Sequence, residues 1–381
     1  MYITVIIGLF LPLAMPAIGG MPATGVWAII LLVYAFFAST LPVTTLLQPR
    51  DYINAWQLFI ALALLVIGIL AAGFAGKLHI VAPAVQLAPE AAPPMWPFLF
   101  ITIACGAISG FHSLVSSGTT SKQVAREEDA TFVGYGSMLL EGALSTLVIV
   151  AVAAGIGIAY QTKDAGILTG TAAWTHHYSS WSAAAGLGAM INAFVEGAAN
   201  MIAVAGIPKA IVIVIMGVFV ASFAGTTLDT ATRIQRYVVQ ELSSDLKIGF
   251  FKNKYVATAF AVITAGLLAF SAGASGKGGL TLWPLFGAGN QVLAGLALLT
   301  ITVYLKKKGG VKYLISGIPA VFMIVMTVWA LIINQINFIN AQNWLLTILN
   351  AAILIIAVWV AFEGFAVFLS GEKPKAAEAE A

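Results

Sequence analysis

Charged residues are scarce in this sequence of 381 residues. Asp, Glu, Lys and Arg occupy 9% of the positions, whereas hydrophobic residues occupy 60%. A water-soluble globular domain carries about 25% charged residues, so this composition excludes one. The apolar surface that the chain cannot bury in its own core must face lipid. The formal net charge is +3, and the sequence has no dense basic patch of the kind that binds nucleic acid.

Cysteine is almost absent. The single Cys105 excludes an intrachain disulfide and a metal site built from several cysteines. The His176-His177 pair has no further ligands at helical spacing, so we expect no metal there. The sequence also shows no nucleophile–base pattern for an intramembrane hydrolase. We therefore expect no bound metal, no cofactor other than a transported Na⁺ or H⁺, and no enzymatic activity.

Long apolar runs dominate what is present. Windows of about 20 apolar residues predict an all-α, polytopic membrane helical bundle with about 10–11 transmembrane helices, formed by residues 1–370. The short, charged segment 371–381 is predicted to be a disordered cytoplasmic tail. The candidate spans lie near 2–19, 25–47, 54–74, 97–117, 132–160, 183–205, 208–228, 255–273, 283–305, 313–334 and 345–370.

The run 183–205 is the doubtful span. Asn192, Glu196 and Asn200 recur every four residues and share one helical stripe. If this run does not cross, most of the 18 Lys and Arg residues fall on one side of the membrane. The positive-inside rule then favours ten spans with both termini cytoplasmic. Residues 183–205 would be re-entrant or interfacial, with the polar stripe facing protein or water.

One apolar run ends in a series of small and hydroxylic residues. Such a break persists inside a bilayer only where it faces protein, water or a solute, and secondary transporters bind solutes at breaks of this kind. We interpret it as a substrate or ion site, in which His112 could also carry a proton. The alternative for a single histidine is a hydrogen-bonded packing residue. The candidate binding residues are Ser109, Gly110, His112, Ser113, Ser116, Ser117, Gly118 and Thr119.

Two further places could complete this site. Asn290 and Gln291 follow Gly287 and Gly289 just inside an apolar run, where amides can bind a solute or satisfy a broken backbone. Glu141 is an ionisable residue at membrane depth, which is a functional candidate by default. We expect Glu141, with His112, to couple transport to an ion gradient. A paired structural role is the alternative for Glu141.

Two charged motifs suggest a gate on the cytoplasmic face. A helix is predicted to end in the neighbouring pair Arg50 and Asp51. Asp229 and Arg233 are one helical turn apart and could pair with each other, and Arg236 follows. The alternative is that these pairs only brace the helix ends.

Five segments carry a resemblance to a known family. They read LPVTTLLQPRDY (41–52), PFLFITIACGAISGFHSLVSSGTTSKQ (97–123), VGYGSMLLEG (133–142), SFAGTTLDTATRIQRY (222–237) and LWPLFGAGNQVLAGLAL (282–298). In order and content they resemble the carbon starvation protein A (CstA) family, over nearly the whole chain. The family is similar to the amino acid–polyamine–organocation superfamily of secondary transporters.

The resemblance implies a role in the cell inner membrane. It implies import of short peptides or pyruvate-like carboxylates by symport with protons or sodium, during the stress of carbon starvation. Family members have further spans upstream, including a Gly-rich broken helix. A second polypeptide is therefore a possible partner, beside the small-molecule substrate and the lipid bilayer. The alternatives are a membrane nutrient sensor or scaffold that does not transport, and a fragment that is inactive without the upstream spans.

Overall fold

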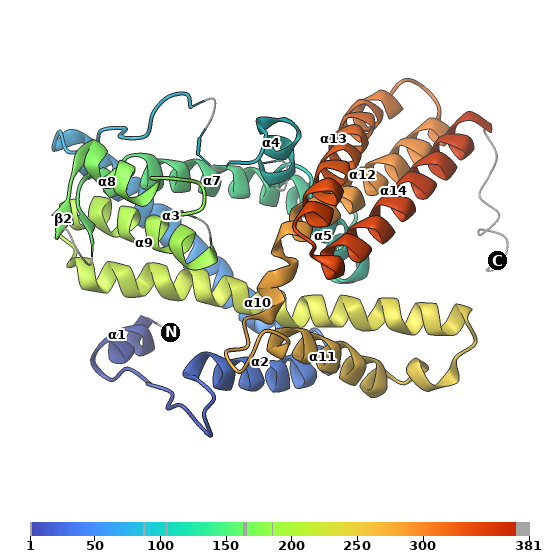
Figure 1. The fold of residues 1–381 in the computed structure, drawn as a ribbon, viewed down its shortest axis with the longest axis horizontal. Helices are drawn as coiled ribbons and strands as arrows, with labels where there is room; N and C mark the ends of the chain where they lie inside the picture. Colours follow the sequence, from blue (N-terminus) through green and yellow to red (C-terminus); the bar gives the residue numbers. More distant parts are fainter. Residues whose placement is uncertain are drawn as a thin grey trace. The chain divides into compact units, whose positions relative to one another are not determined.

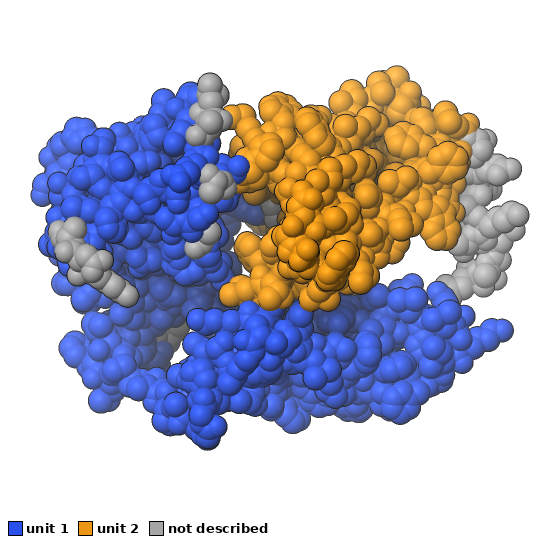
Figure 2. Space-filling view, in the orientation of Figure 1, with its two compact units in different colours: residues 1–92, 139–279 blue, residues 93–138, 280–381 orange. Residues whose placement is uncertain are grey.

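The computed structural model describes residues 2–86, 89–90, 92–103, 106–162, 166–184 and 186–370. Cys105 and the predicted tail 371–381 lie outside these described residues. The chain divides into two compact units (Figures 1 and 2). Unit 1 comprises residues 1–92 and 139–279, and unit 2 comprises residues 93–138 and 280–381.

Unit 1 is built almost entirely from helices. Its only strands among the described residues, β1 (Tyr160–Gln161) and β2 (Ile167–Leu168), form a short antiparallel pair. Helix α7 begins at the end of the first segment of unit 2 and continues through unit 1. The helices are α1 (Tyr2–Phe10), α2 (Ala23–Thr40), α3 (Leu47–Phe74), α7 (Ser137–Ala153), α8 (Gly170–His177), α9 (Leu187–Val204), α10 (Lys209–Asp245) and α11 (Lys254–Phe270).

Unit 2 combines three long helices with several short ones. The long helices are α12 (Trp283–Lys308), α13 (Tyr313–Asn340) and α14 (Trp344–Ser370). Thr302 of α12 and Ser316 of α13 share a hydrogen bond of 2.8 Å near the turn that joins these two helices. The short elements are α4 (Met95–Ile103), α5 (Gly110–Gly118), α6 (Asp129–Thr131) and a π-helical turn over Phe132–Gly136.

The helices confirm an all-α polytopic membrane bundle. Eight helices of the described chain are long and apolar enough to cross a membrane, and α11, with 17 residues, is a shorter apolar helix. The expected span over 97–117 is divided between α4 and α5. The eight are Ala23–Thr40, Leu47–Phe74, Asp129–Gly157, Leu187–Val204, Lys209–Asp245, Gly278–Lys308, Tyr313–Asn340 and Trp344–Leu369.

The first apolar run does not form the expected helix over 2–19. Helix α1 ends at Phe10 and has nine residues, which is about 14 Å of helix against a hydrocarbon core of about 30 Å. Pro12 and Pro16 follow directly, and each lacks the amide hydrogen that helix continuation requires. Hydropathy alone does not register this loss of backbone donors.

The doubtful run 183–205 forms α9. It is the most buried of the eight apolar helices, with half of its 18 residues buried. It packs against α3 and α10 in the core of unit 1. Asn200 donates to the Gly155 and Ala159 carbonyls, and Glu196 pairs with Lys209 at 2.8 Å. Two residues of the polar stripe therefore contact protein, whereas Asn192 is exposed.

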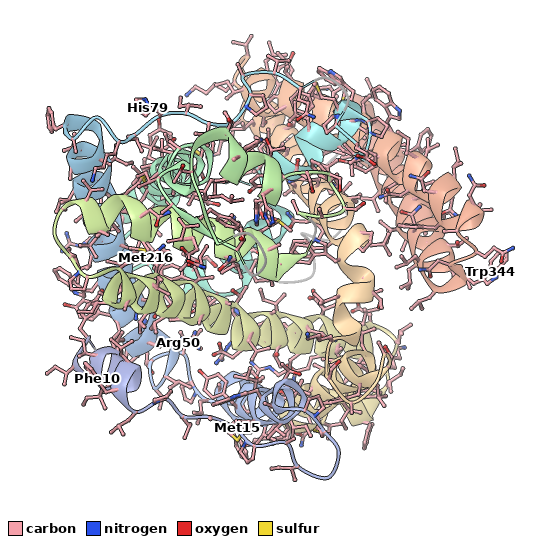
Figure 3. The ribbon with its side chains drawn as sticks, turned by 60° about the vertical axis from the view of Figure 1, so that its left-hand side comes forward. Phe10, Met15, Arg50, His79, Met216 and Trp344 are labelled. Carbon is pink, nitrogen blue, oxygen red and sulfur yellow. The ribbon has the colours of Figure 1, made fainter. Side chains whose placement is uncertain are left out.

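Large apolar side chains cover much of the surface. Phe74 is 90% exposed, and Phe10 and Trp344 project outward from the ribbon (Figure 3). Soluble monomers rarely expose apolar patches of more than a few hundred Å². This distribution is what helices surrounded by lipid require, and it agrees with the membrane class.

Candidate functional site

The break in the helix falls at the start of the hydroxyl-rich segment, whose following residues up to Gly118 form the regular helix α5. Helix α4 ends at Ile103 and α5 begins at Gly110. Ser109 has an extended backbone and is the N-cap of α5, where its Oγ accepts from the His112 amide at 3.5 Å. The first amides of a helix have no partner within the helix. The break therefore presents a set of backbone donors inside an otherwise apolar region.

Asn290 of α12 takes up one of these donors. Its Oδ1 accepts from the Phe111 amide at 2.7 Å, and its Nδ2 donates to Ser109 Oγ at 3.3 Å. Gly110 permits this approach, because a Cβ at that position would overlap the Asn290 carbonyl oxygen and Leu293 Cβ. The structure thus brings Ser109, Gly110 and Asn290 together within unit 2, where Asn290 occupies the Phe111 amide.

The other hydroxyls of α5 bond within their own helix. Ser113 donates to the Gly110 carbonyl at 2.6 Å, Ser116 to Ser113 at 2.8 Å and Ser117 to Leu114 at 3.2 Å. Each hydroxyl has used its one hydrogen and keeps lone pairs free to accept. These oxygens are therefore suited to a cation or to a solute that donates hydrogen bonds.

The remaining candidates in unit 2 differ in accessibility. His112 is exposed, and Gly118 is the last residue of α5. Thr119 is buried, and its Oγ1 has no hydrogen-bond partner among the described residues. Gln291 is completely buried, and neither of its amide atoms has such a partner. An unpaired buried amide costs about 1–3 kcal/mol, which marks Gln291 as a place where a polar guest would be stabilising.

Glu141 is half-buried on α7, in the part of that helix that belongs to unit 1. Its backbone carbonyl accepts from Ser145 Oγ at 2.9 Å. Among the described residues its carboxylate has no ion pair. His112 belongs to unit 2, so each coupling candidate is described within its own unit.

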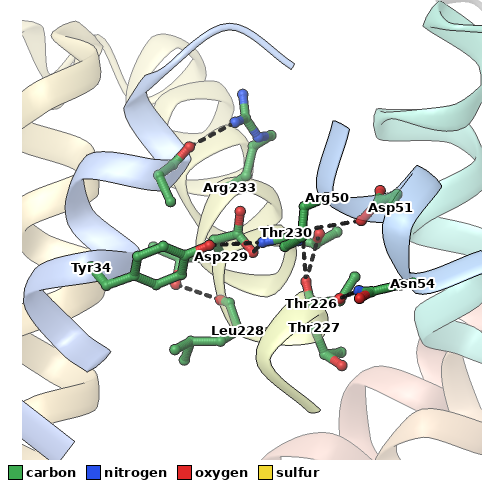
Figure 4. A network of polar contacts seen from close by, with 12 residues as sticks. Tyr34, Arg50, Asp51, Asn54, Thr226, Thr227, Leu228, Asp229, Thr230 and Arg233 are labelled. Atoms are coloured by element: carbon green, nitrogen blue, oxygen red, sulfur yellow. Dashed lines mark hydrogen bonds and ion pairs between the residues drawn. The ribbon is translucent and has the colours of Figure 1, made fainter. Parts of the chain in front are cut away.

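The charged motifs converge within unit 1, in an arrangement that differs from the expected one. Helix α2 ends at Thr40, and Arg50 and Asp51 lie near the start of α3 rather than at the end of a helix. Arg50 Nη1 donates to Asp229 Oδ1 of α10 at 2.6 Å and to the Tyr34 hydroxyl at 3.0 Å (Figure 4). Arg50 Nη2 lies 3.3 Å from Asp51 Oδ1.

This ion pair is the first of three side-chain contacts between α3 and α10, which together we call the polar seam. The residues of α3 are Arg50, Asn54 and Gln57, and their partners on α10 are Asp229, Thr226 and Ser222 in that order. Both sets recur at i, i+4 and i+7, so each forms one stripe on its helix. Asn54 and Gln57 are buried. Beyond the ion pair, the seam thus continues along the two helices as two hydrogen bonds between amide and hydroxyl groups.

The expected pairing of Asp229 with Arg233 is wrong. Arg233 Nη2 instead donates to the Ala38 and Leu41 carbonyls, at 3.0 and 2.9 Å, and Arg236 Nη1 donates to the Ser39 carbonyl at 2.9 Å. These carbonyls lie at the C-terminal end of α2, where the helix dipole places partial negative charge. Both arginines therefore cap α2, and Asp229 is left to Arg50.

The sequence interpretation missed most of the seam. It noted the charged ends but not Asn54, Gln57, Ser222 or Thr226 as partners. Their signal was present, because polar residues at i, i+4 and i+7 on an apolar helix mark a face that does not meet lipid. Two such stripes, on 47–57 and on 222–229, predict a contact between the helices that carry them.

A second buried polar contact lies between the short elements of unit 1. The Tyr160 hydroxyl and His177 Nδ1 are 2.7 Å apart, and His177 is 8% exposed. Burial lowers the pKa of His177, and the neighbouring His176 lowers that pKa further. Among the described residues no group of three His, Cys, Asp or Glu side chains is placed to hold a metal ion.

Relatives of the chain are found among characterised bacterial proteins. The peptide transporter CstA of Helicobacter pylori strain J99 is 35% identical over 331 residues, which are 78% of this chain and 48% of the relative. The pyruvate/proton symporter BtsT of Escherichia coli K12 is 34% identical over 359 residues, covering 78% of this chain and 49% of the relative. The peptide transporter CstA of Bacillus subtilis is 29% identical over 380 residues, covering 88% and 58% respectively.

These matches have a limited extent. The chain spans about half the length of the Helicobacter pylori and Escherichia coli relatives. No solved structure matches it significantly. The family model described as "Carbon starvation protein CstA" matches residues 1–330. On the strength of that match, the chain belongs to the carbon starvation protein CstA family of membrane proteins.

Proposed function

We propose that this chain is part of a secondary active transporter of the inner membrane. It would import short peptides or pyruvate-like carboxylates, driven by a proton or sodium gradient. Relatives named as peptide transporters and as a pyruvate/proton symporter support the substrate classes. The structural observation that carries the proposal is the interrupted helix α4–α5, with its N-terminal amides and hydroxyl oxygens.

Both classes of solute carry a carboxylate, which helix N-terminal amides bind well. In the proposed site the solute carboxylate displaces the Asn290 side chain from the Phe111 amide. Ser109, Ser113 and Ser116 then offer oxygens to the rest of the solute or to the coupling ion. Gln291, next to Asn290 on α12, supplies a buried amide. His112 and Glu141 are the proposed coupling residues.

Counterflow of labelled solute tests the transport proposal. Membrane vesicles containing the chain are loaded with unlabelled pyruvate or dipeptide, and entry of the labelled solute is measured. A parallel preparation adds the upstream spans of a relative on a second polypeptide, the partner that the family resemblance suggests. Entry above that of empty vesicles supports transport. Its absence in both preparations contradicts transport and favours a sensor or an inactive fragment.

Single substitutions test the proposed coupling residues. His112→Ala and Glu141→Gln are each expected to reduce gradient-driven accumulation at least tenfold, because each removes a proton-carrying group. Counterflow without a gradient should fall less. The exposed His79 gives the control His79→Ala. Normal accumulation in the His112 and Glu141 variants would remove both residues from the coupling step.

A further inference from the structure

The polar seam contains a buried ion pair with unequal access to solvent. The Asp229 side chain is 0% exposed, whereas 18% of the Arg50 side chain and 48% of the Asp51 side chain are exposed. Solvent thus reaches the guanidinium of Arg50, whose Nη2 contacts the half-exposed Asp51. Asp229 itself has no such access.

The bonds of the pair leave room for exchange. Asp229 uses only Oδ1 toward Arg50, and its buried Oδ2 has no hydrogen-bond partner among the described residues. Arg50 holds three other contacts, with the Tyr34 hydroxyl, Asp51 and the Thr226 carbonyl. The guanidinium therefore stays in place when Asp229 releases it. The free Oδ2 is where a proton can be added.

Charge balance links the two events. A buried ion pair that loses one partner leaves an uncompensated buried charge. Asp51 is half exposed and compensates Arg50 only weakly, so a second anion beside Arg50 favours the neutral form of Asp229. Resting on the function proposed above, we propose a later stage of the same transport cycle, in which Asp229 takes up the proton that His112 and Glu141 carry while Arg50 holds the carboxylate that the solute presents after it leaves α5.

The step conserves charge and atoms. One proton bonds to Asp229 Oδ2, the ion pair between Asp229 and Arg50 opens, and the solute carboxylate forms a new ion pair with Arg50. One proton enters for each carboxylate, and no net charge is left in the seam. Release of the solute to the cytoplasm reverses the exchange, because Asp229 gives up its proton and pairs with Arg50 again.

The surrounding groups permit this exchange. The charged or titratable groups that face the pair from α2, α3 and α10 are Tyr34, Asp51 and Arg233. Arg233 is engaged with carbonyls of α2, so it does not compete for the carboxylate. Among the described residues, the ion pair of Asp229 is the one with Arg50. Asp229 is therefore the buried carboxylate that pairs with Arg50.

Asp229→Asn is the central variant, because an amide imitates the protonated acid. Asp245→Asn makes the same chemical change at an exposed position of the same helix and is the control. Vesicles containing the chain are assayed for counterflow, for accumulation under a proton gradient and for solute-dependent proton uptake. The probes are labelled pyruvate, a dipeptide and the same dipeptide as its C-terminal amide, which lacks the carboxylate.

Asp229→Asn is expected to keep counterflow and to lose accumulation and proton uptake, whereas Asp245→Asn behaves as the unmodified chain. Arg50→Gln should lose counterflow of both carboxylates, and the peptide amide should not enter at all. Gradient-driven accumulation that survives in Asp229→Asn overturns the inference. So does a folded Asp229→Asn protein that has lost counterflow, because the pair is then only a brace.

A binding measurement covers the case in which vesicles of Asp229→Asn cannot be made. In detergent, the affinity of the unmodified chain for pyruvate should fall about tenfold for each unit of rising pH, as linkage to one proton requires. Asp229→Asn should remove this dependence, and equal dependence in both overturns the inference. If the unmodified chain shows no counterflow, the transport proposal fails first, so the two failures are distinguishable.

Discussion

At the scale of single residues, Asn290 determines the state of the proposed site. It satisfies the Phe111 amide of α5 and contacts Ser109, so it does the work of a cap from another helix. The same atoms would be displaced by a solute carboxylate. Without solute, Asn290 therefore satisfies the donors of the site and keeps it closed. We expect the site to open when an anion replaces the Asn290 oxygen at the Phe111 amide.

Replacing Asn290 by Ala should destabilise the protein by about 1 kcal/mol, the usual cost of losing a cap at a helix N-terminus. Asn290→Asp is the matched control. It keeps an oxygen acceptor and places negative charge where the helix dipole favours it. Thermal unfolding in detergent measures both. Equal stability of the Ala variant and the unmodified chain would show that the contact does not hold α5.

His177 makes stability depend on pH. Its pKa is lowered by burial and by His176, so the folded state favours the neutral ring. The unfolded state takes up the proton first as the pH falls through about 6.5, the ordinary pKa of histidine. The stabilisation is therefore complete above that pH and declines below it.

The unmodified chain should therefore unfold at a lower temperature at pH 5.5 than at pH 7.5, and His177→Gln should reduce this difference. His79→Gln, at an exposed histidine, should leave the difference unchanged. Thermal scans in detergent at both pH values provide the measurement. An undiminished difference in His177→Gln would place the pH dependence elsewhere.

At the scale of elements, close packing positions α5 on α12. Gly110 lies directly against the Asn290 carbonyl and Leu293, whereas Gly118, at the other end of α5, has open space around it. The N-terminal end of α5 is thus fixed by backbone contact. At its C-terminal end, Gly118 has no such contact.

Gly110→Ala is expected to destabilise the chain by at least 1 kcal/mol, because overpacking forces a backbone shift and typically costs 1–3 kcal/mol. Gly118→Ala has no such clash and should be close to neutral. Thermal unfolding of the two variants makes the comparison. Similar behaviour of both would mean that α5 is not seated on α12 in this register.

The elements also show what the sequence could predict. Apolar length identified most of the spans. The onset of hydroxylic residues lies next to the break between α4 and α5, although most of those residues form the regular helix α5. The prediction of a helix over 2–19 was wrong, because prolines lack the backbone donors that a helix needs and a hydropathy average does not take this into account. The pairing of Asp229 depended on which helix lies beside α10. The spacing of Asp229 and Arg233 on one helix does not give this, and only the matching polar stripes on 47–57 and 222–229 indicate it. The capping by Asn290 likewise depended on which helix lies beside α5.

At the scale of the whole molecule, the proposed functional residues are distributed over the two units. The interrupted helix and its amides belong to unit 2, and the polar seam with its ion pair belongs to unit 1. Symport requires solute binding to be linked energetically to ion binding. In unit 1 this account places the link at Arg50, which can hold a carboxylate only when Asp229 is neutral.

Accessibility of the interrupted helix is the most direct test of the central claim, which is that this segment receives the solute. Ser116→Cys is made in a Cys105→Ser background and treated in vesicles with a membrane-impermeant maleimide. The account predicts labelling that excess pyruvate or dipeptide slows several-fold. The control Ile149→Cys, at an exposed apolar position of α7, should stay unlabelled in lipid. Ser116→Cys that does not react, or that reacts equally with and without solute, would contradict the account.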